Sequence, residues 1–104
     1  MYRQGDLLFV QVDGPQSKTQ KLVEDGVLAR GESTGHAHRI APEALQQGKV
    51  KVYQLDQPRR IVIEAFEAVR VLHEEHQPIT LPAGTWEVRQ QREYTPQEVR
   101  YVVD

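Results

Sequence analysis

Residues 49–72 read KVKVYQLDQPRRIVIEAFEAVRVL, and this stretch decides the fold class. Valine, isoleucine and tyrosine dominate its two ends and its middle, and such residues favour strands. Short strands are therefore expected around residues 50–53, 61–63 and 69–72. A helix through residues 63–75 is the competing interpretation, because alanine and glutamate favour helices. It ranks second, since β-branched runs flank it on both sides.

The strand pattern continues outward in both directions. Short apolar runs recur between glycine, proline and aspartate residues, which punctuate strands. Further strands are expected at residues 7–12, 27–30, 79–81, 86–88 and 99–103. The clearest helical signal is at residues 42–48, which begin with proline and end with glycine. The sequence predicts one all-β domain over residues 1–104, a small β-barrel or sandwich with at most one short helix.

Composition narrows the classes of function. The chain has 104 residues, of which 38% are hydrophobic and 27% charged, so it can bury one core and keep a polar surface. Its formal net charge is −2, which gives no broad positive field for nucleic-acid phosphates; nucleic acid is not indicated as a partner, nor is it excluded. Because there is no cysteine, a bound metal must be held by imidazole, carboxylate or water.

Location is inferred from the absence of targeting features. Residues 1–6 lack the basic start and apolar core of a signal peptide, and they lead directly into a strand-like run. No apolar stretch approaches the roughly 20 residues that span a bilayer. We therefore expect a cytoplasmic protein with no membrane partner.

The strongest functional signal is the distribution of the four histidines, which form two close pairs. His36 and His38 are two residues apart, so on a strand both rings project from one face. His73 and His76 are three apart, which places both rings on one side of a turn or helix. Pro78 follows and makes a turn plausible. We predict that the two pairs converge on one metal or catalytic site.

Metal chemistry follows from these ligand types. Neutral imidazole suits divalent transition metals such as zinc, iron and nickel, and three protein ligands plus an open position is typical of catalytic metals. Glu75, Glu74 and Glu43 are candidates for a carboxylate ligand, for a partner that orients a histidine, or for a general base acting on bound water. The sequence does not choose among these roles, and Glu75 is our catalytic candidate.

A second candidate cluster lies towards the C-terminus. Five residues at alternate positions share one face of an unbroken strand: Trp86, Val88, Gln90, Arg92 and Tyr94. The face begins apolar and becomes polar, which suggests that it enters a polar pocket. Arg92 can hold a phosphate or carboxylate, and Tyr94 can donate a proton or hydrogen bond. An edge strand with solvated ends explains the pattern equally well.

Two short motifs resemble those of small single-domain cupins, a family of metal-binding β-barrels. In residues 31–48, His36-x-His38 is followed by Glu43, which is similar to the first cupin motif. Residues 82–84, Pro-Ala-Gly, are similar to the Pro-x-Gly turn of the second. The resemblance implies a barrel that holds a metal through a histidine pair, a glutamate and a later histidine.

The chain also departs from the cupin pattern. Glu87 stands where the second motif has its histidine, which puts Glu43 and Glu87 in doubt as ligands. His73 and His76 precede the Pro-x-Gly turn and can replace the lost histidine.

Three hypotheses follow. The leading one is a four-histidine metal site in a small metal-dependent hydrolase or oxygenase acting on a small molecule. The second is a metal-free hydrolase, acting on a phosphodiester through paired histidines as acid and base, with Arg92 holding the anion. The third is a noncatalytic interaction module. A strand at residues 98–103 can also pair across a two-fold axis, which would give a homodimer.

Overall fold

The computed structural model describes residues 1–13, 20–31, 35–56, 59–90, 92–94 and 99–101. Its strands are β1 (Tyr2–Gln4), β2 (Leu7–Gln11), β3 (Gln20–Leu22), β4 (Val27–Arg30), β5 (Ala37–Ile40), β6 (Val50–Asp56), β7 (Arg59–Ala65), β8 (Val69–Leu72), β9 (Ile79–Leu81), β10 (Gly84–Gln90), β11 (Arg92–Tyr94) and β12 (Val99–Tyr101). Within these ranges there is one helix, α1 (Pro42–Gln46). The prediction of an all-β domain with at most one short helix is confirmed. The competing helix through residues 63–75 is wrong, because β7 and β8 occupy most of that stretch.

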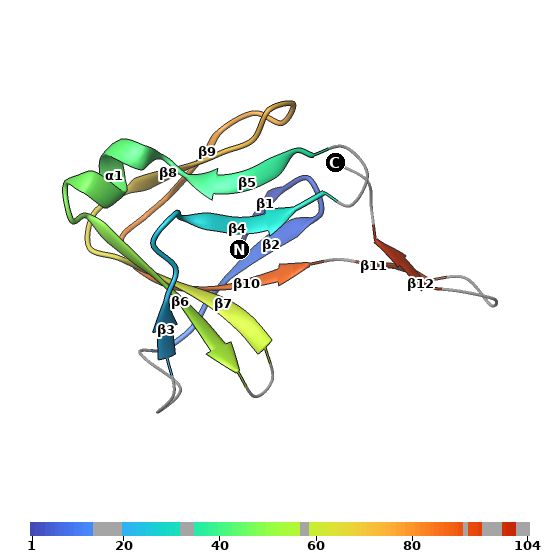
Figure 1. Ribbon diagram of the computed structural model, residues 1–104, viewed down its shortest axis with the longest axis horizontal. Coiled ribbons are helices and arrows are strands. Elements are labelled where there is room, and N and C mark those ends of the chain that lie inside the picture. Colours follow the sequence, from blue (N-terminus) through green and yellow to red (C-terminus); the bar gives the residue numbers. More distant parts are fainter. Residues whose placement is uncertain (14–19, 32–34, 57–58, 91, 95–98, 102–104) are drawn as a thin grey trace.

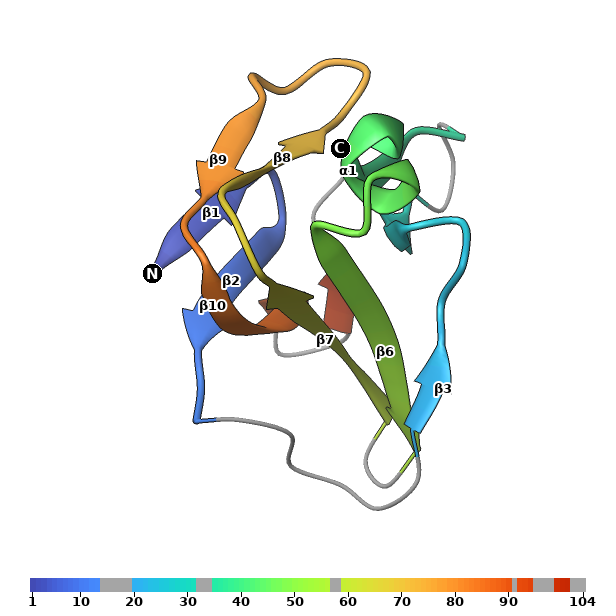
Figure 2. The same ribbon diagram turned by 90° about the vertical axis from the view of Figure 1, so that its left-hand side faces the viewer.

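The strands pair antiparallel in two main sheets (Figure 1). One sheet has the order β1-β2-β10-β7-β6-β3, and the other has the order β4-β5-β8-β9. The edge strands β1 and β9 lie beside each other (Figure 2). Among the described residues, however, the hydrogen-bonded ladder does not continue from one sheet into the other. The two sheets therefore do not form a closed barrel.

The core lies between the two sheets because one face of each main strand is apolar. On β2, Leu7 and Phe9 are fully buried, while the intervening Leu8 is only half-buried. Val88 of β10 is paired with Phe9. The largest fully buried apolar side chains that the other strands contribute to this core are Ile40, Val52, Ile63, Val71 and Leu81. Burial of this apolar surface is the main force that holds the two sheets together.

Helix α1 covers one end of the two sheets (Figure 2). It starts at Pro42, whose fixed backbone angle suits the first helical position and whose missing N–H leaves no unsatisfied donor. Gly48, just beyond its end, has a positive φ of 69°, which other residues rarely adopt. The helix turns the chain from β5 into β6. No helix in the described part of the chain is long and apolar enough to cross a membrane.

Two sequence expectations concern the C-terminal residues. Strand β10 ends at Gln90, and Arg92–Tyr94 form β11, which pairs with β12 as a separate two-stranded sheet (Figure 1). The five alternate positions from Trp86 to Tyr94 therefore belong to two strands in different sheets. Of the strand expected at residues 99–103, the first three residues form β12, and residues 102–103 lie outside the described residues.

Candidate functional site

The pairing of β5 with β8 brings the two histidine pairs together. Arg39 is paired with Leu72, and Ile40 with Val71, so the start of β5 lies beside the end of β8. His36 immediately precedes β5, and His38 is its second residue. Residues 73–76 form the bend between β8 and β9, as the turn interpretation of the sequence predicts. Both pairs therefore lie at one end of the two central strands of the four-stranded sheet.

The four imidazole rings form a single cluster around His73. The centroid of the His73 ring lies 4.4 Å from that of His38, 4.5 Å from that of His76 and 5.5 Å from that of His36. The rings of His38 and His76 are nearly parallel, with centroids 6.0 Å apart. The structure thus brings together all four predicted metal ligands. Their binding of a metal stays a prediction.

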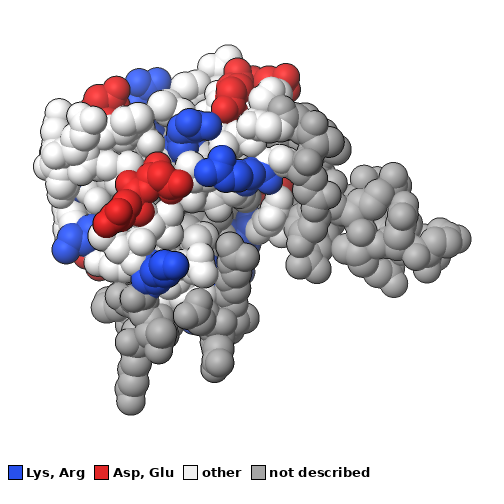
Figure 3. All heavy atoms as spheres, viewed as in Figure 1, with Lys and Arg blue, Asp and Glu red and all other residues white. Residues whose placement is uncertain are grey.

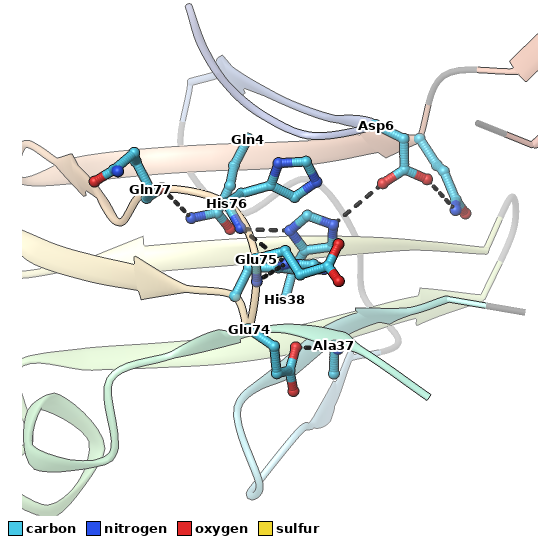
Figure 4. Close-up of polar contacts among 10 residues, drawn as sticks. Gln4, Asp6, Ala37, His38, Glu74, Glu75, His76 and Gln77 are labelled. Atoms are coloured by element: carbon cyan, nitrogen blue, oxygen red, sulfur yellow. Dashed lines mark hydrogen bonds and ion pairs between the residues drawn. The ribbon is translucent and has the colours of Figure 1, made fainter. Parts of the chain in front are cut away.

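His38 is the deepest member of this histidine cluster and is held on both sides. Its side chain is only 1% exposed. Nδ1 lies 2.9 Å from Oε1 of Gln4, and Nε2 lies 3.1 Å from Oδ1 of Asp6 (Figure 4). Gln4 and Asp6 are also buried, at 2% exposure each. Both ring nitrogens of His38 are therefore already engaged within the protein.

The hydrogen bonds of Gln4 fix which nitrogen of His38 is a donor. The Nε2 amide group of Gln4 donates to the carbonyl oxygens of Val71 and Gln77, at 2.9 Å in each case. Oε1 of Gln4 therefore faces His38 and can only accept, so Nδ1 of His38 donates to it. Nε2 faces the Asp6 carboxylate. While these contacts are in place, both nitrogens of His38 are used within the protein.

Asp6 also connects the histidine cluster to β10. Nε2 of Gln90 donates to Oδ2 of Asp6 at 2.6 Å, while Oδ1 of Asp6 faces His38. We refer to the buried residues Gln4, Asp6 and His38, together with the exposed Gln90 that donates to Asp6, as the buried polar network. It joins β5 of one sheet to β10 of the other and to the turn between β1 and β2. Sequence reasoning missed the roles of Gln4 and Asp6, because polar residues around a glycine before a strand normally mark a solvated turn.

His73 is held by the backbone of its own bend. Its Nδ1 accepts from the N–H of Glu75 at 3.0 Å and from the N–H of His76 at 3.3 Å. In the neutral ring, the proton is consequently on Nε2, which is buried. A metal ion bound through Nε2 requires the other tautomer, with the proton on Nδ1, and so breaks the two backbone hydrogen bonds that Nδ1 accepts.

Glu74 closes the histidine cluster on its outer side. Its Oε2 accepts from the backbone N–H of Ala37 at 2.9 Å (Figure 4), and its Oε1 accepts from Arg39 at 3.1 Å. The Ala37 N–H holds the pKa of the Glu74 carboxyl below its ordinary value, and the Arg39 charge acts in the same direction. Ligand atoms of His36, His73 and Glu74 lie within 4.8 Å of one another. These three residues can therefore bind one metal ion.

The other glutamates considered from the sequence lie in different places. The Glu75 carboxylate is 3.8 Å from Nε2 of His36 and is 63% exposed. Its catalytic role stays a prediction. Glu43 is exposed on α1. The Glu87 carboxylate contacts Arg60 and Arg89 on the six-stranded sheet, at 3.9 and 3.3 Å.

The predicted roles of Arg92 and Tyr94 are not decided by this arrangement. Both residues belong to β11, whose partner is β12. Figure 1 shows these two strands extending to one side of the two main sheets. The side chains of both residues lie outside the described part of the structure. Their proposed contacts with an anion and a substrate proton stay predictions.

Glu74→Gln is expected to change how stability depends on pH. Because the folded-state pKa of Glu74 is lowered, its ionised form stabilises the fold above the ordinary value of 4.5, and this stabilisation is lost as pH falls through the folded pKa. The wild type should therefore exceed Glu74→Gln in unfolding free energy near neutral pH, and the difference should shrink in acid. Urea unfolding of the metal-free wild type and of metal-free Glu74→Gln, repeated from acid to neutral pH, measures this difference in unfolding free energy. The exposed Glu67→Gln provides the control, and a Glu74→Gln difference independent of pH would contradict the prediction.

Comparison with known proteins gives a family but no activity. No curated protein and no solved structure matches the chain. Residues 3–91 match a family described as a domain of unknown function, DUF8820. The matched region contains all four histidines and the buried polar network, and it ends before Arg92 and Tyr94. Since the match covers most of the sequence, the chain belongs to the DUF8820 family.

Proposed function

We propose that this domain binds a divalent transition metal at the histidine cluster, with His36, His73 and Glu74 as the main ligands. The observation that carries the proposal is the proximity of their ligand atoms, all within 4.8 Å of one another. His36 and His73 are half-buried and Glu74 is exposed. A metal ion held by them would therefore lie at the surface of the cluster, accessible to a small molecule.

The ligand set favours a reactive metal rather than a structural one. Two imidazoles and one carboxylate leave coordination positions for water or substrate, as in zinc hydrolases and in non-haem iron oxygenases. We therefore retain a metal-dependent hydrolase or oxygenase as the proposed activity. Zinc, iron and nickel are the candidate metals. Glu75 lies near His36 and is the candidate base for a bound water.

The remaining two histidines have different proposed roles. His76 lies next to His73 and is the candidate fourth ligand. His38 packs against His73 from behind, but both of its nitrogens are hydrogen-bonded to Gln4 and Asp6. We assign His38 as a positioning residue, which fixes where the His73 ring can lie. It would become a ligand only after the buried polar network had opened.

A cupin-like origin of the site is part of the same proposal. The His36-x-His38 pair gives the chain its likeness to the first cupin motif. In the folded chain, Glu43 is exposed on α1, and Glu87 contacts Arg89 on the six-stranded sheet. Glu74 instead lies beside His36 and His73. The proposed metal site therefore uses the bend between β8 and β9 instead of the second cupin motif.

Metal titration tests this proposal directly. Protein treated with a chelator and then titrated with zinc or cobalt(II) should bind about one equivalent per chain, and cobalt should show the visible absorption of a site with nitrogen ligands. The double variant His36→Ala/His73→Ala should lose stoichiometric binding. Glu74→Gln should bind on the order of 10 to 100 times more weakly. Glu43→Gln, a matched change on α1, should bind as the wild type does.

The results also separate the competing hypotheses. Full metal binding by the double variant, or none by the wild type, would rule out the proposed site. Hydrolysis of a phosphodiester that survives a strong chelator and has a bell-shaped pH profile would favour the metal-free hydrolase. Absence of both metal binding and turnover would favour the interaction module. Light scattering tests the predicted homodimer, which a strictly monomeric mass would contradict.

A further inference from the structure

A cavity lies between the six-stranded sheet and β4, apart from the proposed metal ligands. It has a volume of about 750 Å³, within the usual range of roughly 300–1,000 Å³ for small-molecule sites. Its walls come from β2, β4, β6, β7 and β10, so it is built on strands of both sheets. None of the four histidines lines it. The cavity is therefore a separate candidate site.

Part of the cavity wall is apolar. Leu7 and Leu28 are buried, at 0% and 6% exposure, and they belong to the core beneath it. Ile61 and Val88 pack against that core and remain partly exposed. An apolar group placed here would cover Ile61 and Val88 and gain the usual free energy of hydrophobic burial.

The charged residues of the lining are mostly arginines. Among the described lining residues, Arg30, Arg60 and Arg89 carry three positive charges and Glu87 carries one negative charge, which gives a net charge of +2. Arg30 also lies 3.8 Å from Asp25, a carboxylate outside the lining. Figure 3 shows acidic and basic side chains interspersed on one face of the molecule. The described lining is therefore richer in basic than in acidic side chains.

Glu87, the one carboxylate among the described lining residues, does not pair closely with both of its neighbouring arginines. Nε of Arg89 lies 3.3 Å from Oε1 of Glu87, whereas the nearest approach of Arg60 to Glu87 is 3.9 Å, beyond a normal hydrogen bond. Nε of Arg60 is buried and has no hydrogen-bond partner among the described residues. A buried donor without an acceptor is costly, and Glu87 is too distant to pair closely with this guanidinium. Because Nε itself is buried, an anionic group in the cavity would accept from the Nη groups of Arg60, which lines the cavity.

We propose that this cavity binds an apolar anion, a small molecule with an aromatic or aliphatic body and one carboxylate or sulfonate group. The body contacts Ile61 and Val88, and the anionic group accepts from Arg60. This inference stands independently of the proposed metal site, because the two sites use different residues.

Fluorescence titration with 8-anilinonaphthalene-1-sulfonate tests the proposal on chelator-treated wild-type protein. The dye combines an apolar body with one sulfonate, and we expect saturable binding of one dye per chain. Binding to the folded state should also raise the urea midpoint as dye concentration increases. N-phenyl-1-naphthylamine is the same molecule without the sulfonate, and it should bind at least about tenfold more weakly, because it cannot form the charged hydrogen bond to Arg60.

Two variants locate the dye. Arg60→Gln should weaken binding of the sulfonate dye about tenfold and leave binding of the neutral dye unchanged. Arg70→Gln, an exposed change on β8, is the control and should have no effect. Ala29→Phe should fill part of the cavity and weaken both dyes. The proposal is overturned if the two dyes bind equally, if Arg60→Gln and Arg70→Gln behave alike, or if the dye lowers the urea midpoint.

Discussion

Asp6→Ala is expected to lower the free energy of unfolding by about 3–5 kcal/mol, the usual effect of removing one partner from a buried charged pair. Asp6 is 2% exposed, accepts from Nε2 of Gln90, and has its other carboxylate oxygen 3.1 Å from Nε2 of His38. Alanine leaves the buried Nε2 of His38 without this partner and removes the acceptor of the exposed Gln90. In a domain of this size the loss corresponds to a fall of about 4–8 °C in Tm per kcal/mol. Urea unfolding followed by Trp86 fluorescence measures the change.

Two further substitutions make this prediction specific. Asp25→Ala removes a carboxylate that is 61% exposed and accepts from the N–H of Val27, so it should cost only about 1 kcal/mol. Asp6→Asn keeps the volume and one acceptor oxygen, and should cost less than Asp6→Ala. Asp6→Asn can also be compared with Asp25→Ala if Asp6→Ala does not fold. Equal effects of Asp6→Ala and Asp25→Ala would show that the buried polar network does not stabilise the fold.

The strands could be predicted from the sequence because their signal is local. The β-branched runs at residues 50–53 and 61–63 fall inside β6 and β7, which are paired along their whole length. Strands β1 and β3 escaped prediction, since each is three residues long and mostly polar. Whether the sheets close into a barrel depends on hydrogen bonds between edge strands. Residues far apart in the sequence form those edges, and no local pattern encodes their contact.

Convergence of the histidines could be inferred from spacing, whereas the roles of individual residues could not. The rule that alternate residues share a strand face was sufficient to group His36 with His38. It could not show that Gln4 and Asp6 occupy both nitrogens of His38, because β1 and β5 come from different sheets. Glu74 and Glu75 are likewise equivalent in the sequence. The bend places Glu74 against Ala37, and Glu75 remains more exposed.

The buried polar network also connects the two proposed sites. Gln90 lines the cavity and donates to Asp6, which contacts His38, and His38 packs against His73 of the proposed metal site. A ligand that moved the Gln90 side chain would change the hydrogen bonding of Asp6. Such a change would reach the histidine cluster through contacts that are already in place. Measuring zinc affinity with and without saturating dye would quantify this coupling.

Phe9→Ala is expected to lower the unfolding free energy by about 3–5 kcal/mol, through lost hydrophobic burial and an unfilled cavity between the sheets. Phe9 is 0% exposed and faces the core from β2, where its neighbours across the ladders are Tyr2 and Val88. Phe66→Ala is a matched control, since Phe66 is 51% exposed. It should cost less than about 1 kcal/mol.

The same substitutions test whether the Phe9 side chain packs in a core between the two sheets. Urea unfolding of the metal-free protein gives both the free energy and its slope with denaturant, which scales with the surface exposed on unfolding. We expect a lower midpoint with an unchanged slope, because the whole domain should still unfold in one step. Phe9→Leu, with a smaller expected loss, covers the case in which the alanine variant does not fold. Comparable stabilities for Phe9→Ala and Phe66→Ala would contradict the placement of the core between the sheets.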